Sequence, residues 1–239
     1  MFESRQITID DEPTVFLWPK SDKYCMPIIM NDWALYADMI YSYTRKAGVV
    51  LQAGGNCGLY PYLYSIKFEK VFTLEPDSAN FYCLALNCKL DKIIKMNMAV
   101  SNVCGFLEMQ QLTNENVGMH KIGSGGNMVY GITIDALHLP ELDLLHLDLE
   151  GYEENAMVGA IDTLLRCRPT VVLEMPDDPQ NIYRMLKEVR YVSVKKYGES
   201  SLNEIFIPEE ILPLLKIPLD KEPPKKSTRR KKTAPKKTS

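Results

Sequence analysis

The stretch that most constrains the fold of this chain runs from residue 49 to residue 77. It begins with the apolar run Val49–Leu51, which is typical of a strand buried on both faces of a parallel sheet. A glycine-rich segment follows, with Gly54, Gly55 and Gly58. Glycine has no Cβ and accepts positive φ, so the backbone can turn tightly there and approach a ligand.

The second half of this stretch predicts a helix and a further strand. The helix is expected to begin at Leu59 or Tyr60, with free N–H groups that point at the ligand. The strand is expected over residues 71–74 and ends at Glu75, whose carboxylate can accept hydrogen bonds from a ribose diol. Glu75 follows Gly54 by 21 positions, close to the separation expected for such an acid. The order indicates a nucleotide-type cofactor site, with a glycine-rich turn that binds no ligand as the alternative.

Two motifs then carry a resemblance to a known family. Residues 52–58 lack the dinucleotide fingerprint G-x-G-x-x-G and instead fit x-x-G-x-N-x-G. This pattern resembles motif I of the class I S-adenosylmethionine methyltransferases. Residues 143–175 contain a strand that ends in D-x-E-G, a helix, and a strand that ends in Glu. This second segment resembles the signature of the FkbM family, as do the segments EPDSANFYCLALN and MAVSN between the two motifs.

The resemblance covers residues 48–207 and implies both a fold and an activity. The implied fold is α/β and Rossmann-like, the class I methyltransferase fold, with a mostly parallel seven-stranded sheet and helices on both faces. FkbM-like proteins are S-adenosylmethionine-dependent methyltransferases credited with O-methylation of sugars or natural products. We therefore expect S-adenosyl-L-methionine as the cofactor and a small hydroxylated acceptor, such as a sugar, as the partner.

The resemblance also implies which residues bind the cofactor. S-adenosylmethionine would lie across residues 54–58, with Glu75 holding the ribose and Ala99 bordering the adenine. The full expected set is Gln52, Gly54, Gly55, Asn56, Gly58, Glu75, Pro76, Ala99 and Asp148. Two residues depart from the pattern: Gln52 stands where most class I enzymes carry an acid, and His146 where the family often has Lys.

Acidic residues at two further strand ends point to the methyl-transfer end of the site. Asp148 ends the strand expected over residues 142–147, Glu150 lies just beyond it, and Glu174 ends the next strand. Ligands of parallel sheets bind at this carboxyl edge. An alcohol acceptor needs a general base, and the candidates in order are Asp148, Glu150 and His146. One alternative is that Glu150 only supplies negative charge at the start of the following helix. Another is that the three carboxylates bind a metal ion, although we expect no metal site here.

Residues 103–134 interrupt the alternation of strands and helices. Strands are expected over residues 105–110 and 128–134, joined by a loop rich in Gly and Asn, as in an insertion that covers the substrate. His120 is the one group in this loop with acid–base chemistry near neutral pH, although a lone loop histidine is usually solvated.

Other expected elements lie on either side of these motifs. They are a hairpin of residues 6–9 and 14–18 that covers one edge, a helix capped by Asn31 or Asp32 and ended by Gly48, and a helix from Gly151 to Cys167 with an apolar stripe through Leu165.

Composition agrees with one cytoplasmic enzyme domain. The six cysteines form no C-x-x-C pair and no zinc spacing, so we expect reduced thiols. No apolar run approaches the roughly 18 residues of a membrane span, and the acidic N-terminus is unlike a signal peptide. We divide the chain into an N-terminal extension over residues 1–30, a methyltransferase domain over 31–217, and a tail over 218–239.

The net charge of −3 conceals a basic tail. Residues 221–239 contain nine Lys or Arg and one Glu, and no large apolar side chain, so we expect them to be disordered. Such a tail either stays solvated or contacts a polyanion. The tail supports one rival function, a nucleic-acid methyltransferase, but no Lys lies between Lys121 and Lys187 to pair with the acids. The other rival is a noncatalytic binding module that kept the fold.

Overall fold

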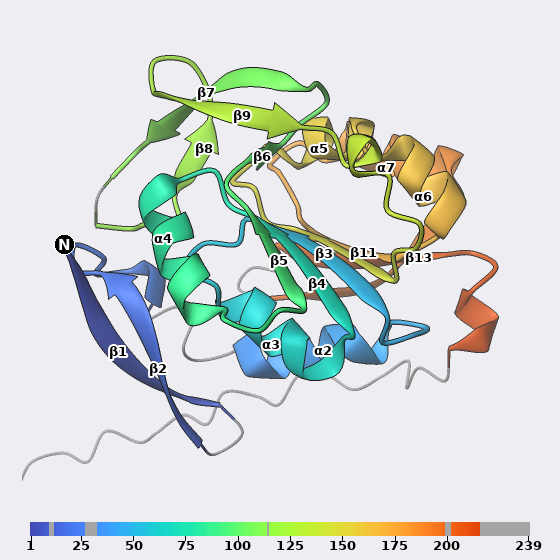
Figure 1. Ribbon diagram of the computed structural model, residues 1–239. Coiled ribbons are helices and arrows are strands. Elements are labelled where there is room, and N and C mark those ends of the chain that lie inside the picture. Colours follow the sequence, from blue (N-terminus) through green and yellow to red (C-terminus); the bar gives the residue numbers. More distant parts are fainter. Residues whose placement is uncertain (10–11, 27–32, 114, 199–201, 216–239) are drawn as a thin grey trace, which may run out of the picture.

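The computed structural model describes residues 1–9, 12–26, 33–113, 115–198 and 202–215 (Figure 1). A seven-stranded sheet runs through its centre in the order β12-β13-β11-β10-β3-β4-β5. The strands are β3 (Val49–Ala53), β4 (Lys70–Leu74), β5 (Ile93–Met96), β10 (Leu144–Leu147), β11 (Thr170–Glu174), β12 (Tyr191–Tyr197) and β13 (Asn203–Pro208). Strand β13 runs antiparallel to both of its neighbours, β11 and β12, and the other neighbouring strands of this sheet pair in parallel. The mostly parallel seven-stranded sheet that the sequence predicts is confirmed.

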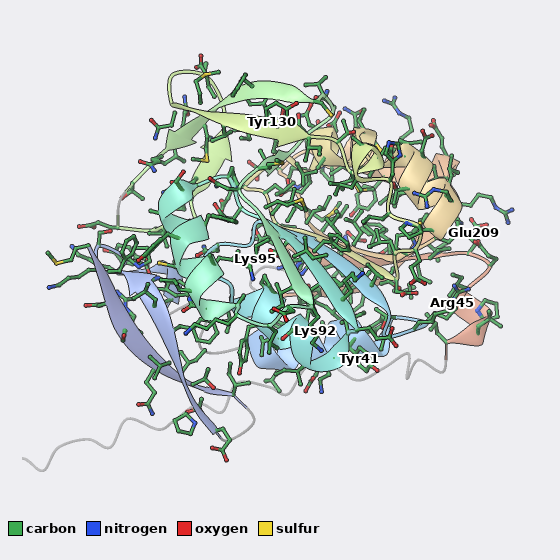
Figure 2. All side chains as sticks on the ribbon, in the orientation of Figure 1. Tyr41, Arg45, Lys92, Lys95, Tyr130 and Glu209 are labelled. Atoms are coloured by element: carbon green, nitrogen blue, oxygen red, sulfur yellow. The ribbon has the colours of Figure 1, made fainter. Side chains whose placement is uncertain are left out.

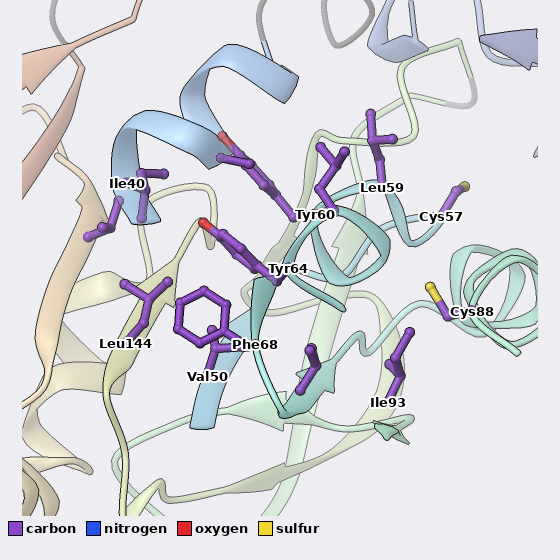
Figure 3. Packing of buried hydrophobic residues seen from close by; sticks show 14 of the residues in the cluster. Ile40, Val50, Cys57, Leu59, Tyr60, Tyr64, Phe68, Cys88, Ile93 and Leu144 are labelled. Carbon is purple, nitrogen blue, oxygen red and sulfur yellow. The ribbon is translucent and has the colours of Figure 1, made fainter. Parts of the chain in front are cut away.

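Helices cover both faces of this sheet. One face is covered by α2 (Trp33–Ser42) and α3 (Leu59–Lys67), with α4 (Ser78–Asn87) beside them, and the other by α5 (Glu153–Val158), α6 (Ile161–Cys167) and α7 (Gln180–Glu188). Alternation along the strands separates two cores: Val50 and Leu144 pack toward α3, and Leu51 and Leu145 pack toward α5. Figure 3 shows the first core, in which Tyr64 of α3 lies among the aliphatic side chains.

Two helix boundaries differ from the prediction. Helix α2 ends at Ser42, not at Gly48, because the side chains of Ser42 and Thr44 bond back to the carbonyls of Met39 and Tyr41. The expected caps Asn31 and Asp32 lie outside the described residues.

The predicted helix 151–167 is two helices, α5 and α6, with a break at Gly159. A Cβ on Gly159 would lie 2.2 Å from the carbonyl oxygen of Ser101, so the chain bends where it passes that backbone. The break reorients α6, and Leu165, predicted to belong to the apolar stripe, is 54% exposed.

The N-terminal hairpin packs on the helices α3 and α4, whereas the sequence predicted that it would cover one edge. Strands β1 (Phe2–Ile9) and β2 (Glu12–Pro19) form a separate two-stranded sheet. The backbone N–H of Leu17 donates to the Asn87 side chain of α4 at 2.7 Å, and the Asn87 amide donates back to the Leu17 carbonyl at 2.9 Å. Phe16 meets Tyr62 of α3 edge to face. Residues 10–11 of the predicted turn lie outside the described ranges.

A second, four-stranded sheet lies above the carboxyl edge of the main sheet (Figure 1). Its strands are β6 (Ala99–Val100), β7 (Gly105–Gln111), β8 (His120–Ile122) and β9 (Asn127–Ile132), in the order β6-β9-β7-β8. Strands β7 and β9 confirm two predictions. Strand β8 lies where the sequence predicts a loop, because three residues are too few to show a periodic pattern. These residues form a strand because they pair with β7.

The outer face of this second sheet carries a pair of exposed aromatic rings. Tyr130 of β9, labelled in Figure 2, meets Phe106 of β7 edge to face. Within the described ranges, none of the helices has the length and apolar content that a membrane crossing requires.

Candidate active site

A cavity of about 270 Å³ lies between the carboxyl edge of the main sheet and the second sheet. We call its floor the sheet side, which consists of Gly54, Asn56, Glu75, Pro76, Asp148, Glu150 and Glu174. We call its opposite wall the cover side, which consists of Cys25, Met109, Asn116, Val117, Gly118, His120 and Ile122. Apolar side chains of Met98, Ala99 and Val100 line the cavity between them.

The glycine turn after β3 is held between two neighbouring strands. The backbone N–H groups of Gly54 and Gly55 donate to the carbonyl of Leu74 at 3.1 and 2.9 Å, and Asp148 N donates to Ala53 O at 3.2 Å. Gly54 has a φ of +84°, and a Cβ on it would lie 1.9 Å from the carbonyl oxygen of Asp148. Only glycine fits this position, because both the φ and the contact exclude a side chain.

Glu75 is buried at the end of β4 with both carboxylate oxygens engaged. It is 5% exposed; Oε2 accepts from Asn56 N at 2.7 Å and Oε1 from Asp77 N at 2.8 Å. Burial raises the pKa of Glu75 to about 7, although these two N–H donors counteract the rise. Each carboxylate oxygen keeps a lone pair, so the group can still accept hydrogen bonds from a ligand.

Three residues predicted to bind the cofactor lie behind the turn and outside the cavity lining. Gln52 is fully buried; its amide donates to Ala53 O and Gly54 O at 3.2 and 2.9 Å and accepts from Thr73 Oγ1 at 2.9 Å. Its polar atoms are therefore engaged in holding the turn. Gly55 and Gly58 make room for α4: an added Cβ would lie 2.5 Å from Leu84 Cδ1 or 2.8 Å from Cys88 Sγ, respectively. The other six predicted residues all line the cavity.

Asp148, Glu150 and Glu174 converge at the other end of the sheet side, and we call them the acidic trio. Each offers a carboxylate oxygen that lies within 4.8 Å of the others. They meet because β10 and β11 are adjacent, with Leu147 paired to Leu173. Burial and the neighbouring carboxylates raise the pKa of Asp148 well above its usual range and that of Glu150 to about 7.

The backbone around Glu150 is in a sparsely populated conformation. Glu150 has a φ of +54° and is followed by Gly151 at +93°. A left-handed conformation is unfavourable for a residue that has a Cβ, and such strain concentrates at functional sites.

His146 does not reach the cavity, although the sequence offered it as a candidate base. Its side chain leaves the middle of β10 into the core on the α3 side, where Nδ1 lies 2.8 Å from Tyr64 Oη and the ring meets Tyr60 edge to face. Burial lowers the pKa of His146 to about 3, so the ring stays neutral. The structure thus separates His146 from Asp148, two residues later, which lines the cavity.

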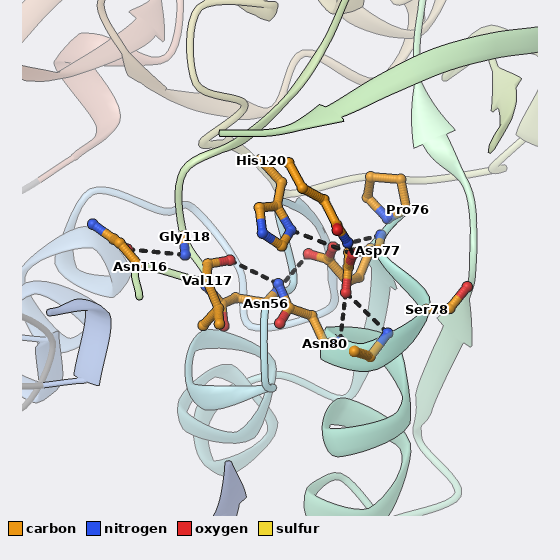
Figure 4. Close-up of polar contacts among 12 residues, drawn as sticks. Asn56, Pro76, Asp77, Ser78, Asn80, Asn116, Val117, Gly118 and His120 are labelled. Atoms are coloured by element: carbon orange, nitrogen blue, oxygen red, sulfur yellow. Dashed lines mark hydrogen bonds and ion pairs between the residues drawn. The ribbon is translucent and has the colours of Figure 1, made fainter. Parts of the chain in front are cut away.

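His120 joins the cover side to α4 and is not the solvated loop residue that its context suggested. Its side chain is 8% exposed, and Nδ1 lies 3.4 Å from Asp77 Oδ2 (Figure 4). Asp77 also caps α4 through Ala79 N and Asn80 N, both at 2.9 Å.

The charges of His120 and Asp77 stabilise each other. Burial opposes the ionised form of Asp77, but the nearby His120 imidazole and the hydrogen bonds from Asn80 N and the Gln111 amide outweigh it and lower the pKa of Asp77 to about 2. Burial also opposes protonation of His120, but Asp77 raises its pKa above the usual value. The ion pair is therefore present at pH values between the pKa of Asp77 and the raised pKa of His120, and it is lost as the pH rises through the latter.

Asp22 holds the remainder of the cover side, and sequence reasoning missed it. The carboxylate is 2% exposed; Oδ1 accepts from Cys25 N and Val117 N, and Oδ2 from Trp18 Nε1 and Met26 N. These bonds connect the N-terminal extension to a loop 95 positions away. No local pattern marks Asp22, because its partners are distant in sequence.

Comparisons with known proteins agree with this architecture. A model of the methyltransferase FkbM domain matches residues 61–198. The crystal structure of methyltransferase FkbM from Methylobacillus flagellatus KT is similar, with a TM-score of 0.50 and 12% identity over 76% of this chain and 52% of that one. This chain therefore spans about half the length of that protein. At this identity the likeness shows the fold alone.

A second solved structure has the same general likeness. It is magnesium protoporphyrin IX methyltransferase from Synechocystis PCC 6803 with bound SAM, at a TM-score of 0.49 and 8% identity over 78% of this chain and 85% of that one. Among curated proteins, no match was found.

Proposed function

This chain belongs to the FkbM methyltransferase family, whose domain model matches more than half of its residues, and from this premise we propose that it transfers a methyl group from S-adenosylmethionine to a hydroxyl group of a small acceptor. The observation that carries the proposal is the cavity that joins Glu75 to the acidic trio at one sheet edge. A sugar is the acceptor class that we favour.

The lining fits S-adenosylmethionine. The carboxylate of Glu75 can accept hydrogen bonds from a ribose diol, and the apolar side chains of Met98, Ala99 and Val100 suit a flat purine ring. Gly54 presents backbone without a side chain, so a ligand can approach the turn closely. When bound, the cofactor supplies an electrophilic methyl group.

Within the acidic trio we propose Glu150 as the general base and Asp148 as a positioning residue. A pKa of about 7 lets Glu150 accept the acceptor's hydroxyl proton near neutral pH. Burial and the neighbouring carboxylates raise the pKa of Asp148 well above its usual range, which favours the protonated carboxyl, and in that form Asp148 can donate a hydrogen bond that orients the acceptor. This assignment reverses the order of candidate bases expected from the sequence, because Asp148 is more buried than Glu150 and its pKa is raised further.

Calorimetric titration with S-adenosylmethionine tests the cofactor part of the proposal. We expect micromolar binding to the full chain, weakened about 10- to 100-fold in Glu75→Gln, because hydrogen bonds to a charged group contribute roughly 1.5–3 kcal/mol each. Glu69→Gln, an exposed acid six positions earlier, should bind as the wild type does. Absence of binding to the wild type would favour the noncatalytic module.

The division of the chain also remains a proposal, with one modification. Residues 31–217 would form the methyltransferase domain, but Cys25 of the N-terminal extension lines the cavity, so the extension would take part in binding. The basic tail at residues 221–239, on which the nucleic-acid alternative depends, lies outside the described residues.

A further inference from the structure

The ionisable side chains that line the cavity are almost all acidic. They include the carboxylates of Glu75 and the acidic trio, against a single imidazole, His120, whose positive charge is already paired with Asp77. Among the described residues, no Lys or Arg lines the cavity. The methyl-transfer end therefore presents negative charge without a cation in contact with it.

The lysines at β5 donate to backbone carbonyls outside the cavity lining. Lys92 and Lys95, next to and on β5 (Figure 2), donate to the carbonyls of Phe68 and Cys88 at 3.0 and 2.7 Å. Lys121 of β8 lowers the pKa of Glu150 through its charge, but it does not line the cavity. Burial and the charges of Glu174 and Glu153 raise the pKa of Glu150 by more than the charge of Lys121 lowers it.

A further anion in this cavity would add to an existing repulsion. The three carboxylate oxygens already lie within 4.8 Å of one another. At an effective dielectric constant of about 20, a ligand that places a unit negative charge about 5 Å from one ionised carboxylate should bind roughly 100-fold more weakly than a neutral ligand. Hydroxyl and ammonium groups instead bring hydrogen-bond donors, which the carboxylate oxygens can accept.

We propose, on the basis of the proposed function, that the acidic trio selects the methyl acceptor by its charge. The cavity takes an acceptor that is neutral or carries a protonated amine beside the methylated group. It rejects acceptors with a phosphate or carboxylate there. This excludes phosphorylated sugars and nucleic-acid backbones from the methyl-transfer end.

The competing explanation is that the acidic trio serves only the positive charge of the cofactor. A test must therefore hold the cofactor's charge constant and vary the charge on the acceptor side alone. Analogues of S-adenosylhomocysteine in which a CH group replaces sulfur meet this condition, because this carbon is neutral whatever it carries. It can carry a 2-hydroxyethyl, 2-aminoethyl or carboxymethyl arm that extends toward the acceptor.

The affinities of these three analogues for the full chain, measured by calorimetry at low salt, test the proposal. We expect the aminoethyl and hydroxyethyl arms to bind at least tenfold more tightly than the carboxymethyl arm. In Glu174→Gln this ratio should fall at least threefold, and Glu150→Gln provides a second variant should the first not fold. Glu154→Gln, whose carboxylate binds Asn181 on the helix surface, should keep the wild-type ratio.

The outcomes separate this inference from the proposed function. If S-adenosylhomocysteine itself fails to bind, the proposed function is wrong. If it binds and the carboxymethyl analogue binds as tightly as the other two, only the charge selection is wrong. A wild-type preference that survives in both trio variants would likewise overturn the role of the acidic trio.

Discussion

The two sides of the cavity are built in different ways. On the sheet side, neighbouring strands place Glu75, Asp148 and Glu174 together, and backbone hydrogen bonds such as Gly54 N to Leu74 O lock the turn. On the cover side, two buried carboxylates, Asp22 and Asp77, join segments up to 95 positions apart. The sheet side thus depends on backbone pairing spread over many residues, and the cover side on a few side chains. Substitutions should affect the two sides differently.

The largest effect is expected at the turn of the sheet side. Gly54→Ala forces a Cβ to within 1.9 Å of the Asp148 carbonyl at a φ of +84°, so we expect a loss of roughly 4 kcal/mol or more in unfolding free energy. At Gly123, directly after Ile122 of the cover side, an added Cβ would meet the Gln110 side chain at an ordinary 3.6 Å. Gly123→Ala should therefore change stability by less than about 1 kcal/mol. Urea unfolding measures both, and equal losses would contradict the comparison.

Asp22→Ala should produce the next largest effect, on the cover side. It removes the acceptor for four buried N–H groups and releases Val117 from the N-terminal extension. We expect a loss of about 3 kcal/mol in unfolding free energy and at least tenfold weaker binding of S-adenosylhomocysteine. Asp91→Ala, at an exposed turn, is the control. Unchanged ligand affinity in a destabilised Asp22→Ala protein would show that the cover side is not needed for cofactor binding.

The raised pKa values on the sheet side predict that stability falls as pH rises. Glu153, fully buried behind the acidic trio, has its pKa raised to about 7 by burial. The folded state therefore favours the protonated carboxyl; this stabilisation is complete below about pH 4.5 and is lost as pH rises through 7. We expect Glu153→Gln to match the wild type at pH 4.5 and to exceed it by about 2 kcal/mol at pH 8. Chemical unfolding at both pH values measures the difference.

Glu154→Gln, one position further along α5, is the control for that measurement. Its carboxylate binds the Asn181 amide at 3.0 Å, outside the cavity. The stability difference between the two pH values should equal that of the wild type. If Glu153→Gln behaves in the same way, the pH dependence arises from another group.

The smallest effect is expected at the contact between the cover side and α4. Asp77 raises the pKa of His120, so this ion pair stabilises the cover below that pKa and is lost as pH rises through it. We expect His120→Asn to lower amide-exchange protection of β8 about fivefold at pH 6, with a smaller difference at pH 8.5. His138→Asn is a matched control, because Asn tolerates the left-handed φ of +46° at that residue. Equal protection in the wild type and His120→Asn at pH 6 would contradict this role.

The prediction of the fold from sequence was most accurate where neighbours in sequence are also neighbours in space. Strands β3 and β4, the turn at Gly54 and the acid Glu75 all follow from one contiguous stretch, since apolar runs and glycines act locally. The prediction was wrong where a contact with a residue distant in sequence determines the secondary structure. Helix 151–167 divides at Gly159 because of Ser101, and β8 exists because β7 pairs with it.

The sequence by itself determined the sheet, the glycine turn and the presence of acids at the strand ends, because strand periodicity and glycine's backbone freedom are local properties. Only the tertiary structure decided which polar residues face the cavity. Gln52 and His146 lie in strands that end at the same edge as Asp148, yet their polar atoms point to Thr73 and Tyr64 inside the protein. It also decided the protonation of each acid, because pKa values depend on burial and on charges brought close by folding.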